Sequence, residues 1–155
     1  MANVVPDSFK TDLLKGTFNF DSSGGSTFKL ALYTDISGLT TATTAFTATN
    51  EVGTSGTNYT SGGNSLTNNG VAVSSNIAYV DFADLTFSSV TLSAVGALIY
   101  KSSSGNEAVL VLDFGGTKTA TNGDFVVQFP TANSSSALLD LATRNKIWSS
   151  NGFNS

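Results

Sequence analysis

The sequence predicts an all-β fold, an antiparallel β-sandwich or jelly-roll-like barrel of about eight strands with one short N-terminal helix. Three observations lead to this prediction. Apolar residues recur with a period of two along most of the chain after Phe18. Turn motifs rich in Gly and Asn separate the apolar runs about every ten residues. No run is followed by a helical pattern long enough for a parallel crossover connection.

The segment Ser8–Gly16 has the pattern of a helix. Phe9 and Leu13 lie four residues apart and therefore share one face. Its first residue or Asp7 can cap the N-terminal end, and its last residue, a glycine, can end the helix. Because a helix of about two turns is marginal alone, we expect its apolar side to rest on the remaining fold or on a partner.

Five apolar runs are predicted strands. In the first run, Phe28, Leu30 and Leu32 alternate with other residues, which is typical of a strand with one buried face. Gly96 predicts a bulge or bend in the third run, and Pro130 ends the last. The runs are Phe28–Tyr33, Ile77–Phe82, Val90–Tyr100, Val109–Phe114 and Phe125–Phe129.

Shorter features complete the assignment. Ala137–Leu141 fits either a strand or a helix start, and we assign it as a strand. The region from Asp35 to Gly63 has neither period, so we predict a long excursion. Five side chains are expected to pin it, namely Ile36, Leu39, Phe46, Val52 and Tyr59. The predicted turns are Asn69-Gly70, Ser104-Gly105-Asn106, Gly115-Gly116 and Asn122-Gly123-Asp124.

The domain organisation follows from these assignments. The 155 residues suit one compact unit, with an N-terminal segment at 1–24, a sandwich domain at 25–142 and a C-terminal tail at 143–155. The tail is polar but carries Ile147, the single tryptophan Trp148 and Phe153. Tryptophan is enriched in interface hot spots. Docking on a partner and folding back on the sandwich both remain open, and we favour the partner.

The composition excludes several function classes. The chain has no His and no Cys, which removes the common acid-base residue, thiol chemistry and the usual zinc ligands. Asp81 and Asp84 lack the spacing of a calcium loop. We therefore expect no enzyme, no metal and no cofactor. Seven scattered basic residues and a net charge of −4 argue against nucleic acid. No apolar run could span a membrane, and no secretion signal is visible, so we expect synthesis in a cytoplasm.

Several stretches of the chain resemble a family of small structural proteins encoded by tailed bacteriophages. The resemblance covers most of residues 8–141 and concerns strands and turns rather than catalytic chemistry. It lies in Phe9–Gly16, Phe28–Tyr33, Ala78–Phe87, Gly96–Tyr100, Val111–Gly115 and Asn122–Pro130. The resemblance implies a virion component without fixing its place on the particle.

We therefore hypothesise a non-enzymatic virion protein, foremost a head decoration or cement protein that binds the major capsid protein and forms a homo-oligomer on the particle. Alternatives are another virion location, at the tail, neck or fibre attachment, and a carbohydrate-binding module for host attachment. In the second alternative Tyr33, Tyr59, Tyr79 or Trp148 would stack on sugars. The expected partner-interface residues are Phe9, Leu13, Phe46, Tyr59, Ile147, Trp148 and Phe153.

Overall fold

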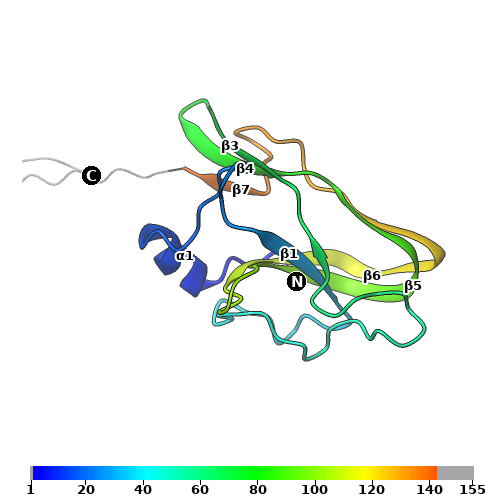
Figure 1. Ribbon diagram of the computed structural model, residues 1–155. Helices are drawn as coiled ribbons and strands as arrows, with labels where there is room; N and C mark the ends of the chain where they lie inside the picture. The colour runs from blue at the N-terminus through cyan, green and yellow to red at the C-terminus, as the bar shows by residue number, and fades with distance from the viewer. Residues whose placement is uncertain (1, 143–155) are drawn as a thin grey trace, which may run out of the picture.

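The computed structural model describes residues 2–142 and has an all-β, sandwich-like fold, as the sequence predicts (Figure 1). The larger sheet has the strand order β2-β1-β5-β6, and the smaller sheet has the order β3-β4-β7. All strand pairs are antiparallel. The element bounds are α1 Asp7–Leu14, β1 Phe28–Tyr33, β2 Asn64–Ser65, β3 Asn68–Ser74, β4 Ile77–Phe82, β5 Leu85–Lys101, β6 Ala108–Val127 and β7 Leu139–Leu141.

The main core packs side chains of the two sheets and of the N-terminal segment against one another. A chain of ring contacts runs through it. Phe9 lies 4.9 Å from Phe18, Phe20 stacks on Phe28 at 4.8 Å, and Phe28 meets Phe82 of the smaller sheet at 5.6 Å, all between ring centroids. Such aromatic pairs stabilise beyond their buried area. The N-terminal segment therefore shares one core with the sandwich.

Strand β1 is buried on both faces, which corrects the expectation of one buried face. Leu30 and Leu32 lie in the main core, whereas Ala31 and Tyr33 lie in a second cluster on the opposite face of the larger sheet. That face is covered because the segment between β1 and β2 passes over it. Ile36 and Leu39 of this segment are buried there, with Phe46 packed against them, whereas Val52 and Tyr59 reach the main core. The five predicted anchors are therefore confirmed.

Helix α1 begins and ends close to its predicted positions. Its N-cap residue is Pro6 and no side chain caps it, so the expected cap by Asp7 or Ser8 is wrong. The Ser8 hydroxyl instead donates a hydrogen bond to the Thr43 carbonyl at 3.1 Å. Gly16 follows the helix with φ of 77° and donates its N–H to the Leu13 carbonyl, as expected for a glycine that ends a helix.

Strands β5 and β6 form a long hairpin joined at the predicted turn Ser104–Asn106. The predicted turns at Gly115-Gly116 and Asn122–Asp124 are wrong, because both lie within β6. They mark shifts of register instead: Ala94 pairs with Lys118 while Gly96 pairs with Asp113. The expected bulge at Gly96 is thus confirmed, and the runs Val109–Phe114 and Phe125–Phe129 belong to one strand that ends at Val127.

The hairpin of β3 and β4 turns at Ser75 and Asn76 rather than at Asn69-Gly70. Both turn residues have positive φ, 50° and 62°, which a tight two-residue hairpin turn requires. Asn69-Gly70 lies inside β3, where the register shifts between Asn68 and Gly70. The expected strand near the end of the sandwich is confirmed in shorter form as β7.

Candidate functional site

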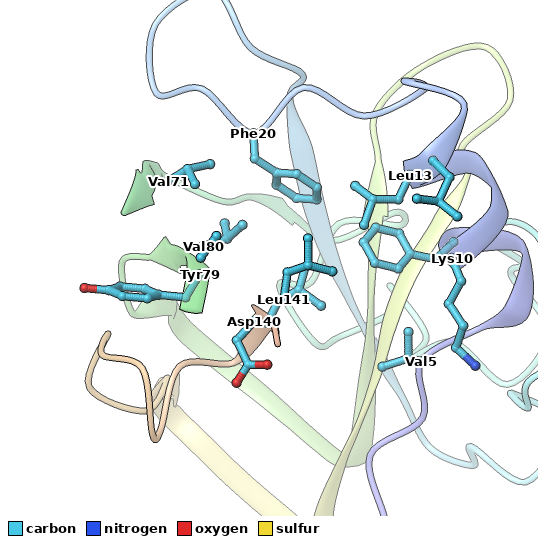
Figure 2. A pocket seen from close by; sticks show the side chains of 13 residues that line it. Val5, Lys10, Leu13, Phe20, Val71, Tyr79, Val80, Asp140 and Leu141 are labelled. Atoms are coloured by element: carbon cyan, nitrogen blue, oxygen red, sulfur yellow. The ribbon is translucent and has the colours of Figure 1, made fainter. Parts of the chain in front are cut away.

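An apolar hollow of about 480 Å³ lies between α1 and the smaller sheet, and we call it the α1 groove (Figure 2). In Figure 1 this is the end of the molecule where α1 faces β3, β4 and β7. Most of its lining residues are apolar. They are Val5, Phe9, Lys10, Leu13, Leu14, Phe20, Val71, Ala78, Tyr79, Val80, Leu139, Asp140 and Leu141.

One wall of the groove is the inner face of the smaller sheet. Val71 of β3 pairs with Val80 of β4, which also pairs with Leu139 of β7, and Ala78 pairs with Leu141. Directly paired residues of antiparallel strands project on the same side, so these five side chains form one apolar surface. Val80 is buried, but Val71 and Leu141 are each 53% exposed. The described chain therefore covers only part of this face.

The opposite wall is α1. Phe9 is 2% exposed and forms the floor where the groove meets the main core. Leu13 is half-buried above it, and Leu14 at the rim is 89% exposed. Leu14 follows Leu13 directly, so its side chain points about 100° around the helix from its neighbour's. The helix thus shows apolar side chains to the groove and beyond its rim.

Two residues of the lining carry a charge, Lys10 and Asp140. The Lys10 ammonium donates to the Asp7 carboxylate at 2.8 Å, and both side chains are largely exposed. Such a surface ion pair contributes little to stability. Asp140 alternates with Leu139 and Leu141 in β7, so its carboxylate projects from the opposite face of the sheet (Figure 2). The groove therefore offers apolar contact and no set of groups arranged for acid-base or nucleophilic work. Its chemistry suits an apolar peptide segment.

The structure brings two of the predicted partner residues together in the groove. Phe9 is its floor and Leu13 lines its helical wall. Phe46 instead stacks on Tyr100 at 4.8 Å between ring centroids, next to the second cluster, and Tyr59 is 4% exposed within the main core. Neither ring faces the groove. The other three predicted residues, Ile147, Trp148 and Phe153, lie outside the described residues.

Tyr59 is a structural tie between the long excursion and β1. Its hydroxyl accepts the Leu32 N–H at 3.0 Å and donates to the Glu51 carboxylate at 2.8 Å. The same carboxylate accepts the Ser61 hydroxyl and the Gly62 N–H. Burial raises the pKa of Tyr59 well above the ordinary tyrosine value. This network closes the outer edge of β1.

Two of the four rings proposed for sugar stacking are also inside the fold. Tyr33 is fully buried, and its hydroxyl donates to the Thr47 carbonyl at 2.6 Å. Burial, with the nearby Glu51 carboxylate, raises the pKa of Tyr33. With Tyr59 also buried, neither ring has a free face for a sugar. Tyr79 is half-buried, and its ring projects from the face of β4 opposite to Val80, away from α1 (Figure 2).

The carboxylates near β4 serve the fold. Asp81 accepts the Asn69 side-chain amide at 2.7 Å, and Asp84 accepts the Phe129 N–H at 2.8 Å. Among residues 2–142, no group of three or more acidic, His or Cys side chains could hold a metal ion. No helix of the same residues is long and apolar enough to cross a membrane.

The sheet wall of the groove was missed by the sequence reasoning. Val71 and Val73 alternate in β3, and Leu139 and Leu141 alternate in β7. This period-two signal was available, but interpreting Asn69-Gly70 as a turn removed β3 from the predicted strands. Recognising the alternation would have predicted a strand with one apolar face at this position.

Comparison with known proteins finds no matching family model, no matching curated protein and no matching solved structure.

Proposed function

We propose that this chain is a non-enzymatic structural protein of a tailed-bacteriophage virion, foremost a capsid decoration protein that strengthens the head. The α1 groove is the observation that carries the proposal. It is a continuous apolar surface, left partly uncovered by the described chain, and the rings of residues 2–142 are otherwise buried or half-buried. Exposed apolar patches of this kind are typical of interaction sites.

The groove can supply a modest but useful free energy of binding. Fully burying a Val or Leu side chain contributes about 1.5–3 kcal/mol. Val71 and Leu141 are about half exposed, so covering them contributes roughly 1 kcal/mol each on that scale. One such contact is weak. Repeated around a symmetric shell, weak contacts add by multivalency, which is how a small decoration protein reinforces a large particle.

The rest of the surface suits dense packing without uncontrolled association. Charged residues make up 12% of the chain, against about 25% in typical domains. The outer edge of β1 is occupied, since the Leu32 carbonyl accepts the Val52 N–H and the Thr34 N–H donates to the Asn50 carbonyl. Part of the β6 edge pairs with Val4. Covered edges of the larger sheet resist strand-to-strand aggregation.

The resemblance to tailed-phage structural proteins supports a virion component, and the groove supports docking on another chain of the particle. Placement at the tail, neck or fibre attachment remains the alternative. The carbohydrate-binding alternative is weaker, because Tyr33 and Tyr59 are buried. A glycan-array screen of the full chain without hits would set it aside.

Capsids assembled without this chain provide the test. Purified chain is added, the particles are sedimented, and their resistance to heating or chelation is compared with that of undecorated particles. We expect binding and greater resistance. A chain that stays in the supernatant, with particles as fragile as before, would show that the proposal is wrong.

A further inference from the structure

We infer that the α1 groove of each copy receives the C-terminal segment 143–155 of a neighbouring copy, with Ile147 and Trp148 as the inserted side chains. This inference rests on the proposed function, in which many copies lie side by side. It identifies the segment that fills the groove, which the shape of the groove alone does not specify.

β7 ends at the groove, directly before the segment. Leu139 and Leu141 line the groove and pair with β4 at Val80 and Ala78. Continuing this register would place residue 143 opposite Asn76, which lies in the tight turn before β4 begins at Ile77. β4 therefore offers no backbone partner to residue 143.

The length and sequence of the segment favour a neighbour's groove over its own. To re-enter the same groove, Ile147 would need a reversal of the chain within residues 143–146, where Asn145 is the one residue of a type that favours turns. Reaching outward needs no reversal. At roughly 3.3 Å per residue, the six residues 143–148 can span up to about 20 Å, which is enough to cross between touching copies.

The side chains of the segment match those of the groove. Ile147 and Trp148 are adjacent apolar residues in an otherwise polar stretch, and the groove wall offers Val71, Val80 and Leu141.

Charge also favours this pairing. Residues 2–142 contain five basic and 11 acidic residues, a net charge of −6, whereas the segment carries Arg144 and Lys146, a net charge of +2. Together these give the −4 of the whole chain. The two basic residues directly precede the apolar pair, so they arrive at an acidic body as the apolar pair enters the groove.

The experiment uses two full-length variants, each defective in one half of the contact. Val71→Asp places a carboxylate in the groove and keeps the segment. Trp148→Ala keeps the groove and removes the only tryptophan of the chain, so in a mixture all tryptophan fluorescence comes from the Val71→Asp protein. Quenching by acrylamide is measured while the Trp148→Ala protein is added from ~10 μM to ~1 mM, the range in which weak interfaces bind.

We expect the tryptophan of Val71→Asp alone to be quenched readily and to become several-fold less accessible, with a blue-shifted emission, as the Trp148→Ala protein is added. Trypsin cleavage after Arg144 and Lys146 should slow in parallel. Val126→Asp is the matched control: Val126 is 49% exposed in β6, outside the groove. A Val126→Asp protein should therefore protect its own tryptophan as the wild type does. Leu141→Asp replaces Val71→Asp if circular dichroism shows that the latter is unfolded.

Three results would overturn the inference. Tryptophan that stays exposed in the wild type at every concentration would show that the segment does not dock. Protection that is independent of concentration, and absent from the mixed variants, would place each segment in its own groove. Protection that survives Val71→Asp would place the segment elsewhere. None of these results depends on capsids, so failure of this inference and failure of the proposed capsid function can be told apart.

Discussion

Tyr59 decides how the long segment between β1 and β2 is attached to the sandwich. Its ring lies in the main core, 5.7 Å from Phe87 between centroids, and its hydroxyl joins the Leu32 N–H to the Glu51 carboxylate. Leu32 is fully buried, so its N–H has no access to water. A single hydroxyl therefore satisfies a buried donor of β1 and holds the excursion in place.

Tyr59→Phe removes this hydroxyl and keeps the ring. Leaving the Leu32 N–H without an acceptor should lower the free energy of unfolding by about 1–3 kcal/mol. Chemical denaturation of the wild type and the variant measures the difference. Tyr79→Phe is the control, since Tyr79 belongs to neither core cluster, and it should change stability by less than about 0.5 kcal/mol. Equal effects of the two substitutions would contradict the assigned role.

The buried tyrosines also predict the alkaline limit of the fold. Burial raises the pKa of Tyr33 and of Tyr59 above the ordinary value near 10. Above that pH the unfolded chain releases phenolic protons that the folded chain retains. The stabilising contribution is therefore fully present below about pH 9 and is lost as pH rises through and beyond 10. Denaturation curves between pH 8 and 11 should show this fall, and Tyr33→Phe should make it shallower. An unchanged slope would contradict it.

At this scale the sequence indicates which side chains are anchors but not which way they face. Ile36 and Val52 stand out because they are apolar residues in a polar stretch, and both are buried. Phe46 and Tyr59 show the same signal and were assigned to a partner interface. A segment without a regular period carries no information on direction, so nothing in the sequence distinguishes a ring that faces the sheet from one that faces a partner.

Among the elements, the β5–β6 hairpin depends on a close approach at Gly96. An added Cβ at this position would lie 2.3 Å from the Leu112 carbonyl oxygen and 2.8 Å from the Ile36 side chain. The absence of a side chain at Gly96 therefore lets β6 and the covering segment approach β5 closely at this position. This explains why a glycine interrupts an otherwise apolar strand.

Gly96→Ala should destabilise the fold by about 1–3 kcal/mol through overpacking, a decrease of roughly 3–10 °C in melting temperature for a chain of this size. Gly53→Ala is the matched control, because an added Cβ there meets nothing within 4 Å, and we expect a change below about 2 °C. Differential scanning calorimetry of both proteins decides the matter. A Gly96→Ala protein as stable as the control would contradict the close packing.

The elements also show where prediction from the sequence ends. β1, β4 and the bulge at Gly96 follow from local periodicity. The turn motifs Gly115-Gly116 and Asn122–Asp124 fit hairpin turns equally well. They prove to be irregularities within β6 because its register is set by β5. The groove was missed for the same reason, since its wall exists only when three strands are paired.

The described molecule is a sandwich in which the smaller sheet extends beyond the residues that cover its inner face. Val80 and Phe82 of β4 are buried in the main core, whereas Val73 at the far end of β3 is 70% exposed. α1 lies over part of this exposed end of the sheet, and the α1 groove is the space that remains between them. The domain thus combines a complete core with one incomplete apolar face, an arrangement suited to a stable subunit that associates with another chain.

Removing residues 143–155 should therefore leave the stability of the domain nearly unchanged and abolish its self-association. Residues within 2–142 already form two buried core clusters, so we expect the truncated chain to melt within about 2 °C of the full chain. Its self-association, measured by sedimentation velocity, should be lost. A large fall in melting temperature would show instead that the segment belongs to the core.

The copy number of the chain in purified particles tests the central claim most directly. A decoration protein on a symmetric head should be present in hundreds of copies, as measured by quantitative mass spectrometry against the major capsid protein. About 6 to 12 copies would place it in a ring at the neck or tail. Absence of the chain from purified particles would contradict a virion role altogether.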